Sequence, residues 1–439
     1  MQQDVTDTAG EVSTSSLHVI CVVDSASEDG GASQTALSTA VELARRGVTV
    51  TLFTGLGPVS SLLFGIHNLR VICLNQKHIL HNSNRIEAAT QGLWNFEAAA
   101  CLRRVLGSSP QGRTVVHIHT WQKCLSNSVL SEAVASRLPT VITAHGFELA
   151  CPIGSLFRPD TNAACNLRPM SAACASCNCD PRNYGHKLWR LTRQFIQVRI
   201  TDPPGAIDAV VVGSRSAGDK LCPHLPKGSQ LHIIPPPIEM NAPTSVVPPS
   251  DDAPLCFVGR FSKEKGAHLW ARAARTLDTP TVFIGDGPMR AELESLCPSA
   301  RFTGWLPFEE VHRHIRESRG IVFPSICLET YGRTVAEAAA LGRGAIVADA
   351  CAAAELVADG ETGFHFRTGN VDSLCDKARQ FLSLGTAAHF GAAAFRRYWD
   401  DPSTLEMYGN RILTLYNKLL DQRNRVNEVA QSRERSIVG

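Results

Sequence analysis

The chain has 439 residues, of which 44% are hydrophobic and 19% charged, and its formal net charge is +2. This length predicts two or three domains rather than one core, and the composition is typical of a soluble globular enzyme. The charge gives no reason to expect a nucleic-acid partner. No apolar run approaches the roughly 18 residues that span a bilayer. The polar residues 1–16 predict a disordered leader rather than a secretory signal.

Short apolar runs alternate with helical patterns through the first half of the chain. Residues 33–46 have the apolar spacing of a helix. This alternation is typical of β-α-β units and a parallel sheet. The apolar runs predict strands at 17–23, 48–53, 69–74, 114–118, 139–143 and 208–212.

The proline-rich segment at 237–253 interrupts the pattern and predicts a linker. The alternation then restarts, with a helix at 267–277. The expected fold class is therefore α/β, with doubly wound, Rossmann-like domains at 17–236 and 254–400 that face a cleft. A last helix at 401–421 would cross back to the first domain, followed by a frayed tail at 422–439. Further strands are predicted at 254–259, 281–285, 320–324 and 345–349.

The strand ending at Gly259 is followed by Arg260, Lys265 and Gly266. A glycine turn with cations before a helix favours a diphosphate, because backbone N–H groups and side chains both attract anions. The alternative is an ordinary loop with solvated lysines. Two further strand-end turns, Gly285-Asp286 and Gly30-Gly31, are weaker signals, since glycine turns are often purely structural.

The stretch LETYGRTVAEAAALG places Glu329 before a helix and Glu337 inside it. We expect Gly332 to let a ligand approach the helix N-terminus. Glu337 would then accept hydrogen bonds from a ribose, and Glu329 would contact hydroxyls beyond the phosphates. The alternative for Glu337 is a carboxylate that only stabilises the helix dipole.

Fifteen cysteines are present. Ten lie scattered through apolar segments, which suits buried thiols in a reducing compartment and predicts a cytoplasmic location. The other five crowd into the segment 150–180. Four of them could hold a structural Zn²⁺ or an iron–sulfur cluster, although a loop of reduced, packed thiols is an equal alternative. The four predicted ligands are Cys151, Cys165, Cys174 and Cys179.

Residues 182–200 carry five Lys or Arg and no acidic residue. Lys187, Arg190 and Arg193 were expected on one face of a helix, with apolar residues such as Trp189 and Phe195 on the other. Such a helix could contact an anionic membrane surface at the inner face of the cell membrane. The alternative is a helix packed on the domain with a solvated basic face.

The second half resembles the retaining glycosyltransferases of family 4, which have the GT-B fold. The matching motifs are FVGRFSKEKG (257–266), IGDGPMRAEL (284–293), FTGWLP (302–307), LETYGRTVAEAAALG (328–342) and AELVADGETGFHF (354–366). The spacing and order of these motifs agree with the family across about 150 residues of the chain. The first half agrees at 30–53, 115–122 and 140–148, and the cysteine segment resembles an insertion in a bacterial subset of the family.

The resemblance implies specific roles. Arg260 and Lys265 would bind the donor diphosphate, Glu337 the ribose, and Glu329 the donor sugar or the departing phosphate. His119 and His145 would lie on the acceptor side, although a lone histidine is more often a core residue. The catalytic set would be His145, Arg260, Lys265 and Glu329. The full donor set would be Gly30, Gly31, Gly259, Arg260, Lys265, Gly285, Asp286, Gly304, Tyr331, Gly332 and Glu337.

One departure from the family pattern precedes Glu355, where CAAAE (351–355) replaces the usual Gly-Gly-x-x-Glu turn. We expect a metal-independent enzyme that moves a sugar from a nucleoside diphosphate to a cell-envelope polysaccharide or lipid-linked acceptor. The alternatives are a nucleotide-sugar epimerase of the same fold, and a metal- or redox-sensing adaptor built on a transferase that has lost its activity.

Overall fold

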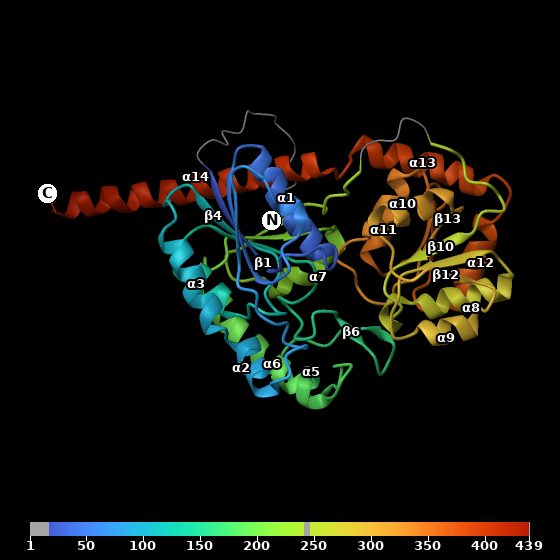
Figure 1. Cartoon of the computed structure of the whole chain (residues 1–439), viewed down its shortest axis with the longest axis horizontal. Helices are drawn as coiled ribbons and strands as arrows, with labels where there is room; N and C mark the ends of the chain where they lie inside the picture. Colours follow the sequence, from blue (N-terminus) through green and yellow to red (C-terminus); the bar gives the residue numbers. More distant parts are fainter. Residues whose placement is uncertain (1–16, 241–245, 439) are drawn as a thin grey trace.

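The computed structural model describes residues 17–240 and 246–438, with side chains described up to residue 425. The leader predicted at 1–16 and residues 241–245 of the linker lie outside this part. Two parallel sheets, each covered by helices on both faces, form two lobes (Figure 1). This is the doubly wound α/β architecture predicted from the sequence.

The first sheet has seven strands in the order β3-β2-β1-β4-β5-β8-β9, and all neighbours are parallel. The six predicted strands are confirmed, and the edge strand β9 is additional. Their bounds are β1 (His18–Ser25), β2 (Thr49–Leu56), β3 (Leu69–Cys73), β4 (Thr114–Ile118), β5 (Thr140–Thr143), β8 (Ala209–Val212) and β9 (Gln230–Ile233).

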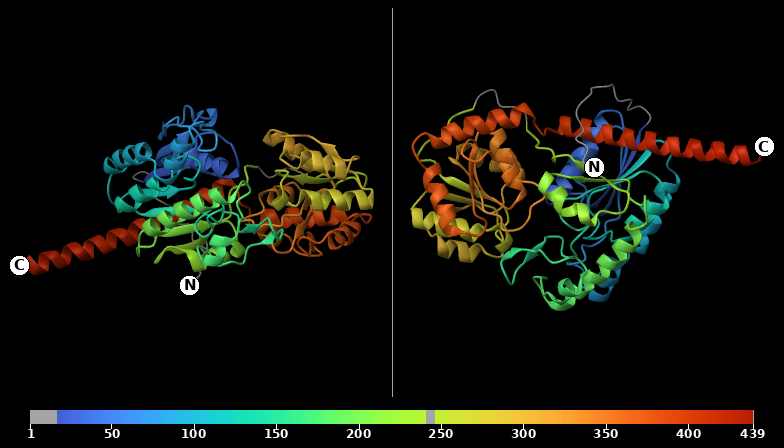
Figure 2. Two further views of the ribbon diagram at one scale, coloured as in Figure 1. Left: turned by 90° about the horizontal axis from the view of Figure 1, so that it is seen from below. Right: turned by 180° about the vertical axis from the view of Figure 1, so that it is seen from behind.

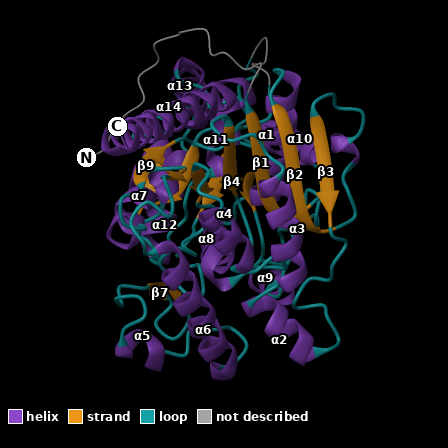
Figure 3. Ribbon diagram, turned by 90° about the vertical axis from the view of Figure 1, so that its left-hand side faces the viewer, coloured by secondary structure: helices purple, strands orange, loops and turns teal. Residues whose placement is uncertain are grey.

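Alternate residues of β1 enter two different cores. Val19, Cys21 and Val23 pack with α1 (Gly31–Arg45), whereas Ile20 and Val22 face α3 (Phe96–Gly107) and α4 (Ser128–Ala135). A strand buried on both faces is therefore apolar throughout, as parallel sheets require. The side view in Figure 3 shows these strands side by side, with helices around them.

The second sheet has six parallel strands in the order β12-β11-β10-β13-β14-β15. Four were predicted, and the edge strands β12 and β15 are additional. Its strands are β10 (Leu255–Val258), β11 (Thr281–Ile284), β12 (Arg301–Phe302), β13 (Gly320–Phe323), β14 (Ala345–Ala348) and β15 (Gly363–Phe366). Its helices are α8 (Ala267–Leu277), α9 (Arg290–Leu296), α10 (Phe308–Glu317), α11 (Arg333–Ala340), α12 (Val371–Phe381) and α13 (Thr386–Asp400).

The last helix, α14 (Leu405–Val438), leaves the second lobe and runs along the first (Figure 2). As predicted, Tyr408, Ile412 and Tyr416 are buried in the core of the first sheet. The prediction of a frayed tail after residue 421 was wrong, because the helix continues to Val438. None of the helices in the described ranges has both the length and the apolar character needed to cross a membrane.

The chain passes between the lobes twice, and the two crossings are tied together. The Ser403 hydroxyl donates hydrogen bonds to the carbonyls of Pro235 and Pro236, at 2.9 Å each. In return, the Ile238 N–H bonds to the Ser403 carbonyl at 2.7 Å. The linker and the start of α14 thus meet at one point between the lobes.

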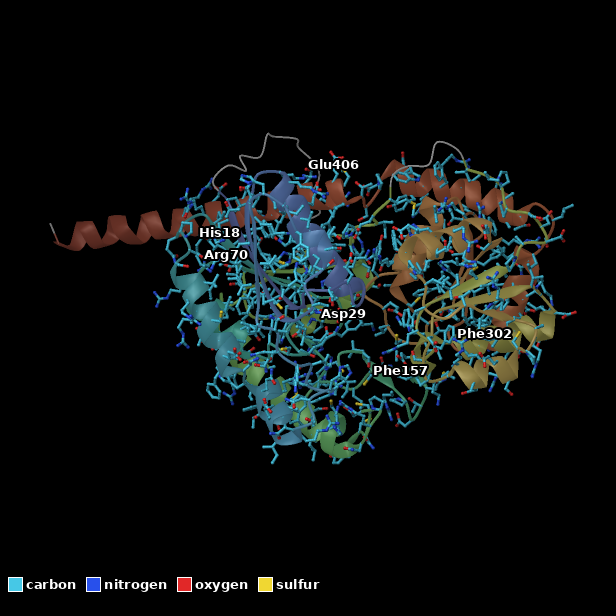
Figure 4. All side chains as sticks on the ribbon, in the orientation of Figure 1. His18, Asp29, Arg70, Phe157, Phe302 and Glu406 are labelled. Atoms are coloured by element: carbon cyan, nitrogen blue, oxygen red, sulfur yellow. The ribbon has the colours of Figure 1, made fainter. Side chains whose placement is uncertain are left out.

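The cysteine segment folds outside the first sheet. It forms the hairpin β6 (Phe157–Arg158) and β7 (Ala163–Ala164), then α5 (Ala172–Ser176), and leads into α6 (Tyr184–Thr201). The hairpin extends toward the second lobe, where Figure 4 labels Phe157. Phe157 belongs to the core cluster of the second lobe, so the insertion bridges the two lobes. The first lobe also contains α2 (Arg85–Leu93) and α7 (Arg215–Leu221).

The orientation predicted for α6 was wrong. Lys187, Arg193 and Gln197 are buried, whereas Leu188 and Phe195 are exposed. The buried polar groups have partners, since Gln194 and Gln197 donate hydrogen bonds to the Leu149 and Glu148 carbonyls. Two of the cations predicted to face a membrane, Lys187 and Arg193, are therefore buried, and contact with an anionic membrane stays a prediction.

Candidate active site in the cleft between the lobes

Both sheets reverse their strand order next to their first strand, between β1 and β4 and between β10 and β13. In open α/β sheets, ligands bind outside the carboxyl ends of strands at such points. The predicted site residues follow these strand ends. His119 comes after β4, Gly259 and Arg260 after β10, and Glu329 after β13.

The loops after β10 and β13 are joined by an ion pair. Lys265 Nζ lies 2.6 Å from Glu329 Oε1, which also accepts a 2.7 Å hydrogen bond from Ser325. Glu329 and the neighbouring Cys327 outweigh the effect of burial and raise the Lys265 pKa. The ammonium is therefore charged at neutral pH, and the structure brings together two of the predicted catalytic residues.

Gly266 lets the same two loops approach each other. It adopts a left-handed conformation at φ 69°, and a Cβ there would lie 1.9 Å from the Pro324 carbonyl oxygen. The Glu264 carbonyl also accepts hydrogen bonds from the Ile326 and Cys327 N–H groups. Only glycine fits both the conformation and the space.

Three predicted donor glycines, Gly259, Gly285 and Gly304, lie together after the ends of β10, β11 and β12. The Gly285 N–H bonds to the Gly304 carbonyl at 3.0 Å, and a Cβ on Gly285 would lie 2.1 Å from the Gly259 carbonyl oxygen. Asp286, also predicted to bind donor, bonds instead to the Gly287 N–H and to Arg290. In this structure Asp286 stabilises its own turn.

Glu337 lies on α11 and is only 4% exposed. Arg333 Nε donates to its Oε1 at 3.0 Å, and His312 Nε2 lies 4.0 Å from its Oε2. Burial raises the Glu337 pKa, and Arg333 opposes this effect. A ribose would have to share this carboxylate with Arg333.

Arg333 was not predicted as a site residue. Its two terminal nitrogens have no hydrogen-bond partner, and Nη1 lies 3.9 Å from the position of a Cβ built on Gly31. Arg333 therefore reaches the Gly30–Gly31 turn of the first lobe, and Gly30 has open space where a side chain would stand. The four-residue spacing from Arg333 to Glu337 was the available signal, since such pairs interact on a helix.

Two residues predicted to contact the donor have other neighbours in the structure. A Cβ on Gly332 would lie 2.6 Å from that of Ala353, so this glycine is needed for packing, and its contact with a ligand stays a prediction. Tyr331 points away from the donor loops and lines a separate cavity of about 350 Å³ with Tyr398 and Arg411. It also packs against Gly213 of the first lobe.

A cavity of about 450 Å³ lies between the lobes. His119 and His145 line it from the first lobe and Arg260 from the second. His119 Nδ1 lies 3.0 Å from His145 Nε2, whereas His119 Nε2 is buried without a hydrogen-bond partner. The Thr330 hydroxyl, next to Glu329, donates to the His145 carbonyl at 3.1 Å. The acceptor-side prediction thus corresponds to one cavity beside the donor loops.

Both histidines are neutral at physiological pH. Burial lowers the pKa of His145 to about 4 and that of His119 well below its ordinary value, with nearby His117 and His145 adding to the effect on His119. A neutral imidazole can donate one hydrogen bond and accept another. This pair can therefore orient a hydroxyl group.

His117 makes stability depend on pH. It is buried between Tyr416 and Thr143 at 2.5 and 2.7 Å, and burial lowers its pKa to about 3. The unfolded chain binds a proton below pH 6.5, but the folded chain does not. The free energy of unfolding therefore has its full value well above pH 6.5 and decreases as the pH falls below it. For His117 alone the decrease is about 1.4 kcal/mol at pH 5.5.

We expect His117→Gln to reduce the loss of unfolding free energy between pH 7.5 and pH 5.5, measured by denaturant titration. His389→Gln, at an exposed position, is the control and should keep the loss seen in the parent protein. Equal losses in all three proteins would contradict this assignment.

Asp24 was not predicted, although it shapes the cavity. Its carboxylate accepts hydrogen bonds from three successive N–H groups, those of Lys123, Cys124 and Leu125, at 2.9–3.1 Å. Burial raises its pKa, and these bonds oppose the rise. Asp24 thus fixes the loop that follows β4, and this loop forms part of the cavity wall.

Glu355, after the atypical CAAAE segment, reaches across to the first lobe. Its carboxylate accepts the Arg215 and Ser216 N–H groups at 3.0 and 2.6 Å, at the start of α7. A carboxylate is favourable there because the first N–H groups of a helix have no partner within it. The departure from the family pattern thus coincides with a contact between the lobes.

Three of the four predicted cysteine ligands, Cys151, Cys174 and Cys179, lie near Lys187, which is fully buried. Lys187 Nζ lies 3.2 Å from Cys179 Sγ and 3.6 Å from Cys174 Sγ. Burial raises the Cys165 pKa, and the Cys151, Cys179 and Cys174 thiols act in the same direction. However, no group of three or more His, Cys, Asp or Glu in the described ranges is arranged to hold a metal ion. The metal therefore stays a prediction.

If these thiols hold zinc, untagged protein should contain about one equivalent by elemental analysis. Cys174→Ser should lose the metal and melt at a lower temperature, because a structural site stabilises the fold directly. Cys177→Ser is the matched control, since this half-buried thiol lies outside the predicted set. A metal-free preparation with unchanged stability would leave a loop of reduced thiols around Lys187.

Two family models match consecutive parts of the chain. The model of Glycosyltransferase Family 4 matches residues 29–242, and that of Glycosyl transferases group 1 matches residues 241–397. Both models describe glycosyltransferases, and together they cover residues 29–397. The first match covers the lobe with the histidine cavity, and the second covers the lobe with Arg260, Lys265 and Glu329.

Curated relatives include a sulfoquinovosyl transferase of Arabidopsis thaliana, 34% identical over 29% of this chain and 26% of the relative. Another is the O-antigen chain mannosyltransferase C of Escherichia coli, 25% identical over 38% of this chain and 47% of the relative. The matched parts thus span about a quarter to a half of these relatives.

Solved structures share the fold over most of the chain. The sucrose-phosphate synthase of Thermosynechococcus elongatus has a TM-score of 0.67 at 17% identity, covering 92% of this chain and 100% of the other. The Anabaena HepE structure in complex with UDP and glucose has a TM-score of 0.61 at 14% identity, covering 92% and 100%. At these identities the likeness shows the fold alone.

Proposed function

We propose that this glycosyltransferase moves a sugar from a nucleoside diphosphate donor to a hydroxyl of a cell-envelope glycan, with retention of configuration at the sugar. The observation that carries the proposal is the pairing of Lys265 with Glu329 at the strand ends beside the cavity of His119 and His145. HepE has been solved with UDP and glucose, and one relative is an O-antigen mannosyltransferase. Both support a nucleotide-sugar donor and a glycan acceptor.

The proposed chemistry follows from the charges. The bond between the sugar and the diphosphate breaks, and the acceptor oxygen takes its place while its proton is released. Negative charge grows on the leaving diphosphate, where Lys265 and Arg260 stabilise it. Arg260 is exposed and pairs with Glu264 at 2.5 Å, so it can turn toward phosphate at little cost. We place the reaction in the cytoplasm and derive no step that requires a metal ion.

The test is a screen of nucleoside diphosphate sugars for release of nucleoside diphosphate. We expect release to accelerate several-fold or more when a saccharide acceptor is added, and NMR of the product to show the anomeric configuration of the donor. Release of a free isomerised sugar nucleotide without acceptor would indicate an epimerase instead. Absence of nucleotide binding by any donor would overturn the proposal.

A further inference from the structure

The wall of the cleft cavity formed by the first lobe is rich in cations. Lys123, Arg182, Arg190 and Arg193 line it, and Arg260 faces them from the second lobe. Only two carboxylates, Asp24 and Glu148, share the lining. Burial raises the pKa of each of these carboxylates, and backbone hydrogen bonds and nearby cations oppose the rise. The other carboxylates that pair with these cations lie outside the lining, at Asp29, Asp180 and Glu264.

Arg193 is the one buried cation among those that line the cavity. It is 3% exposed, and within the described ranges no carboxylate lies within 4 Å of it. Its guanidinium donates to the carbonyl and the side chain of Gln122 and lies 5.2 Å from the centre of the Trp189 ring. Burial and the nearby Arg190 lower its pKa to about 9. The Glu148 and Asp24 carboxylates oppose this lowering. Burial of a cation is costly, and an anionic ligand in the cavity would offset that cost further.

A second, apolar groove adjoins this cavity. It has a volume of about 320 Å³, and Ile79 and Trp189 line both spaces. Ala88 and Ala89 of α2 complete its apolar wall. Large apolar side chains next to its lining residues in sequence are exposed, including Ile86 at 79%, Leu80, Tyr184 and Leu188. These four residues lie on α2, on α6 or in the loop before α2, and contiguous exposed apolar surface marks interaction sites.

We propose that the acceptor is a glycan carried on a long-chain lipid phosphate, with its phosphate at Arg193 and its hydrocarbon chain in the groove between α2 and α6. The ligand class follows from the order of the two spaces, since the cationic cavity lies beside the histidines and the apolar groove lies beyond Trp189. An acidic soluble saccharide would use the cavity alone. The inference rests on the proposed function, because it names the acceptor of the same site.

The test measures binding rather than turnover. Titration calorimetry is performed in a Lys265→Ala background, so that the donor diphosphate site does not compete. The probes are farnesyl diphosphate, farnesol, inorganic pyrophosphate and glucuronic acid. We expect farnesyl diphosphate to bind more than tenfold tighter than each of the others, because it alone can occupy both spaces.

Two variants assign the parts of the ligand. Arg193→Gln should weaken the binding of farnesyl diphosphate more than tenfold, as expected for loss of a charged hydrogen bond. If this variant does not fold, Arg193→Lys replaces it and should also weaken the binding. Ala89→Trp fills the groove and should reduce the affinity to that of pyrophosphate. The controls are Arg199→Gln, at an exposed position on the same helix, and Ala100→Trp, at an exposed position on α3, and neither should change binding.

Each other result overturns the inference in a defined way. Equal binding of glucuronic acid, or no effect of Ala89→Trp, would mean an acidic acceptor without a lipid. If farnesol binds as tightly as farnesyl diphosphate, Arg193 does not bind the phosphate. If no probe binds while the parent protein still binds nucleoside diphosphates, the lipid acceptor is wrong and the proposed transferase function stands. If nucleotides also fail to bind, the proposed function itself is wrong.

Discussion

Lys265→Ala should lower kcat/KM for the donor by about 10²–10³-fold, the range seen when one preorganised charge stabiliser is removed. The two loops that meet here hold Lys265 at 2.6 Å from Glu329. The ammonium group is therefore already in place when charge develops on the phosphate, and the loops need not rearrange. The thermal midpoint should change little, because the side chain is half-buried and Ser325 still donates to Glu329. Initial rates at limiting and saturating donor would measure the effect.

Lys263→Ala is the matched control. Lys263 belongs to the same short 3-10 helix, but its side chain is exposed. This variant should retain the parent's rate, and calorimetry should show that only Lys265→Ala loses affinity for the nucleoside diphosphate. Equal kinetics for the two variants would contradict the assignment of Lys265 to the donor site.

Gly266→Ala should produce the largest loss of stability among the glycine variants near the site. An alanine in the left-handed conformation costs about 1–2 kcal/mol, and here its Cβ would also lie 1.9 Å from the Pro324 carbonyl. Neither atom belongs to a flexible side chain, so the two loops must separate. Because Lys265 and Glu329 lie on these loops, donor affinity should fall together with stability.

Gly369→Ala is the control that separates the effect of backbone strain from the effect of a steric clash. Gly369 has φ 77°, similar to the 69° of Gly266, but a Cβ there would meet nothing within 4 Å. Denaturant titration should show a loss of about 1–2 kcal/mol for Gly369→Ala and at least about 2 kcal/mol more for Gly266→Ala. Similar losses for both variants would mean that the loops adjust freely.

The buried strands could be predicted from the sequence because parallel strands covered on both faces are continuous apolar runs. The structure places β4 at Thr114–Ile118, as predicted, and the other predicted strands within three residues. The edge strands β12 and β15 were missed because they are too short, or too poor in β-branched residues, to stand out from loops. The donor loops were found because glycines and cations follow strand ends.

Interactions between distant segments could not be predicted. The amphipathic pattern of α6 does not show which face is buried, and here polar groups of the insertion and of the loop after β4 bury the basic face. Glu355 was flagged only by an unusual local sequence, since its partner at α7 is 140 residues away. Tyr331 was assigned to the donor site by its position in a motif, although its side chain turns toward the other lobe.

The tie between the two crossings determines how this molecule can open. Because Ser403, Pro235 and Ile238 hold the linker to the start of α14, the two lobes share a single hinge. Rotation about a hinge displaces distant atoms most, and the hairpin that carries Phe157 lies on the opposite side of the molecule from this tie (Figure 1). Opening would draw Phe157 out of the second lobe's core, and closing would bury it again. Burial of the Phe157 side chain therefore favours the closed cleft. Full burial of one phenylalanine stabilises by about 1.5–3 kcal/mol.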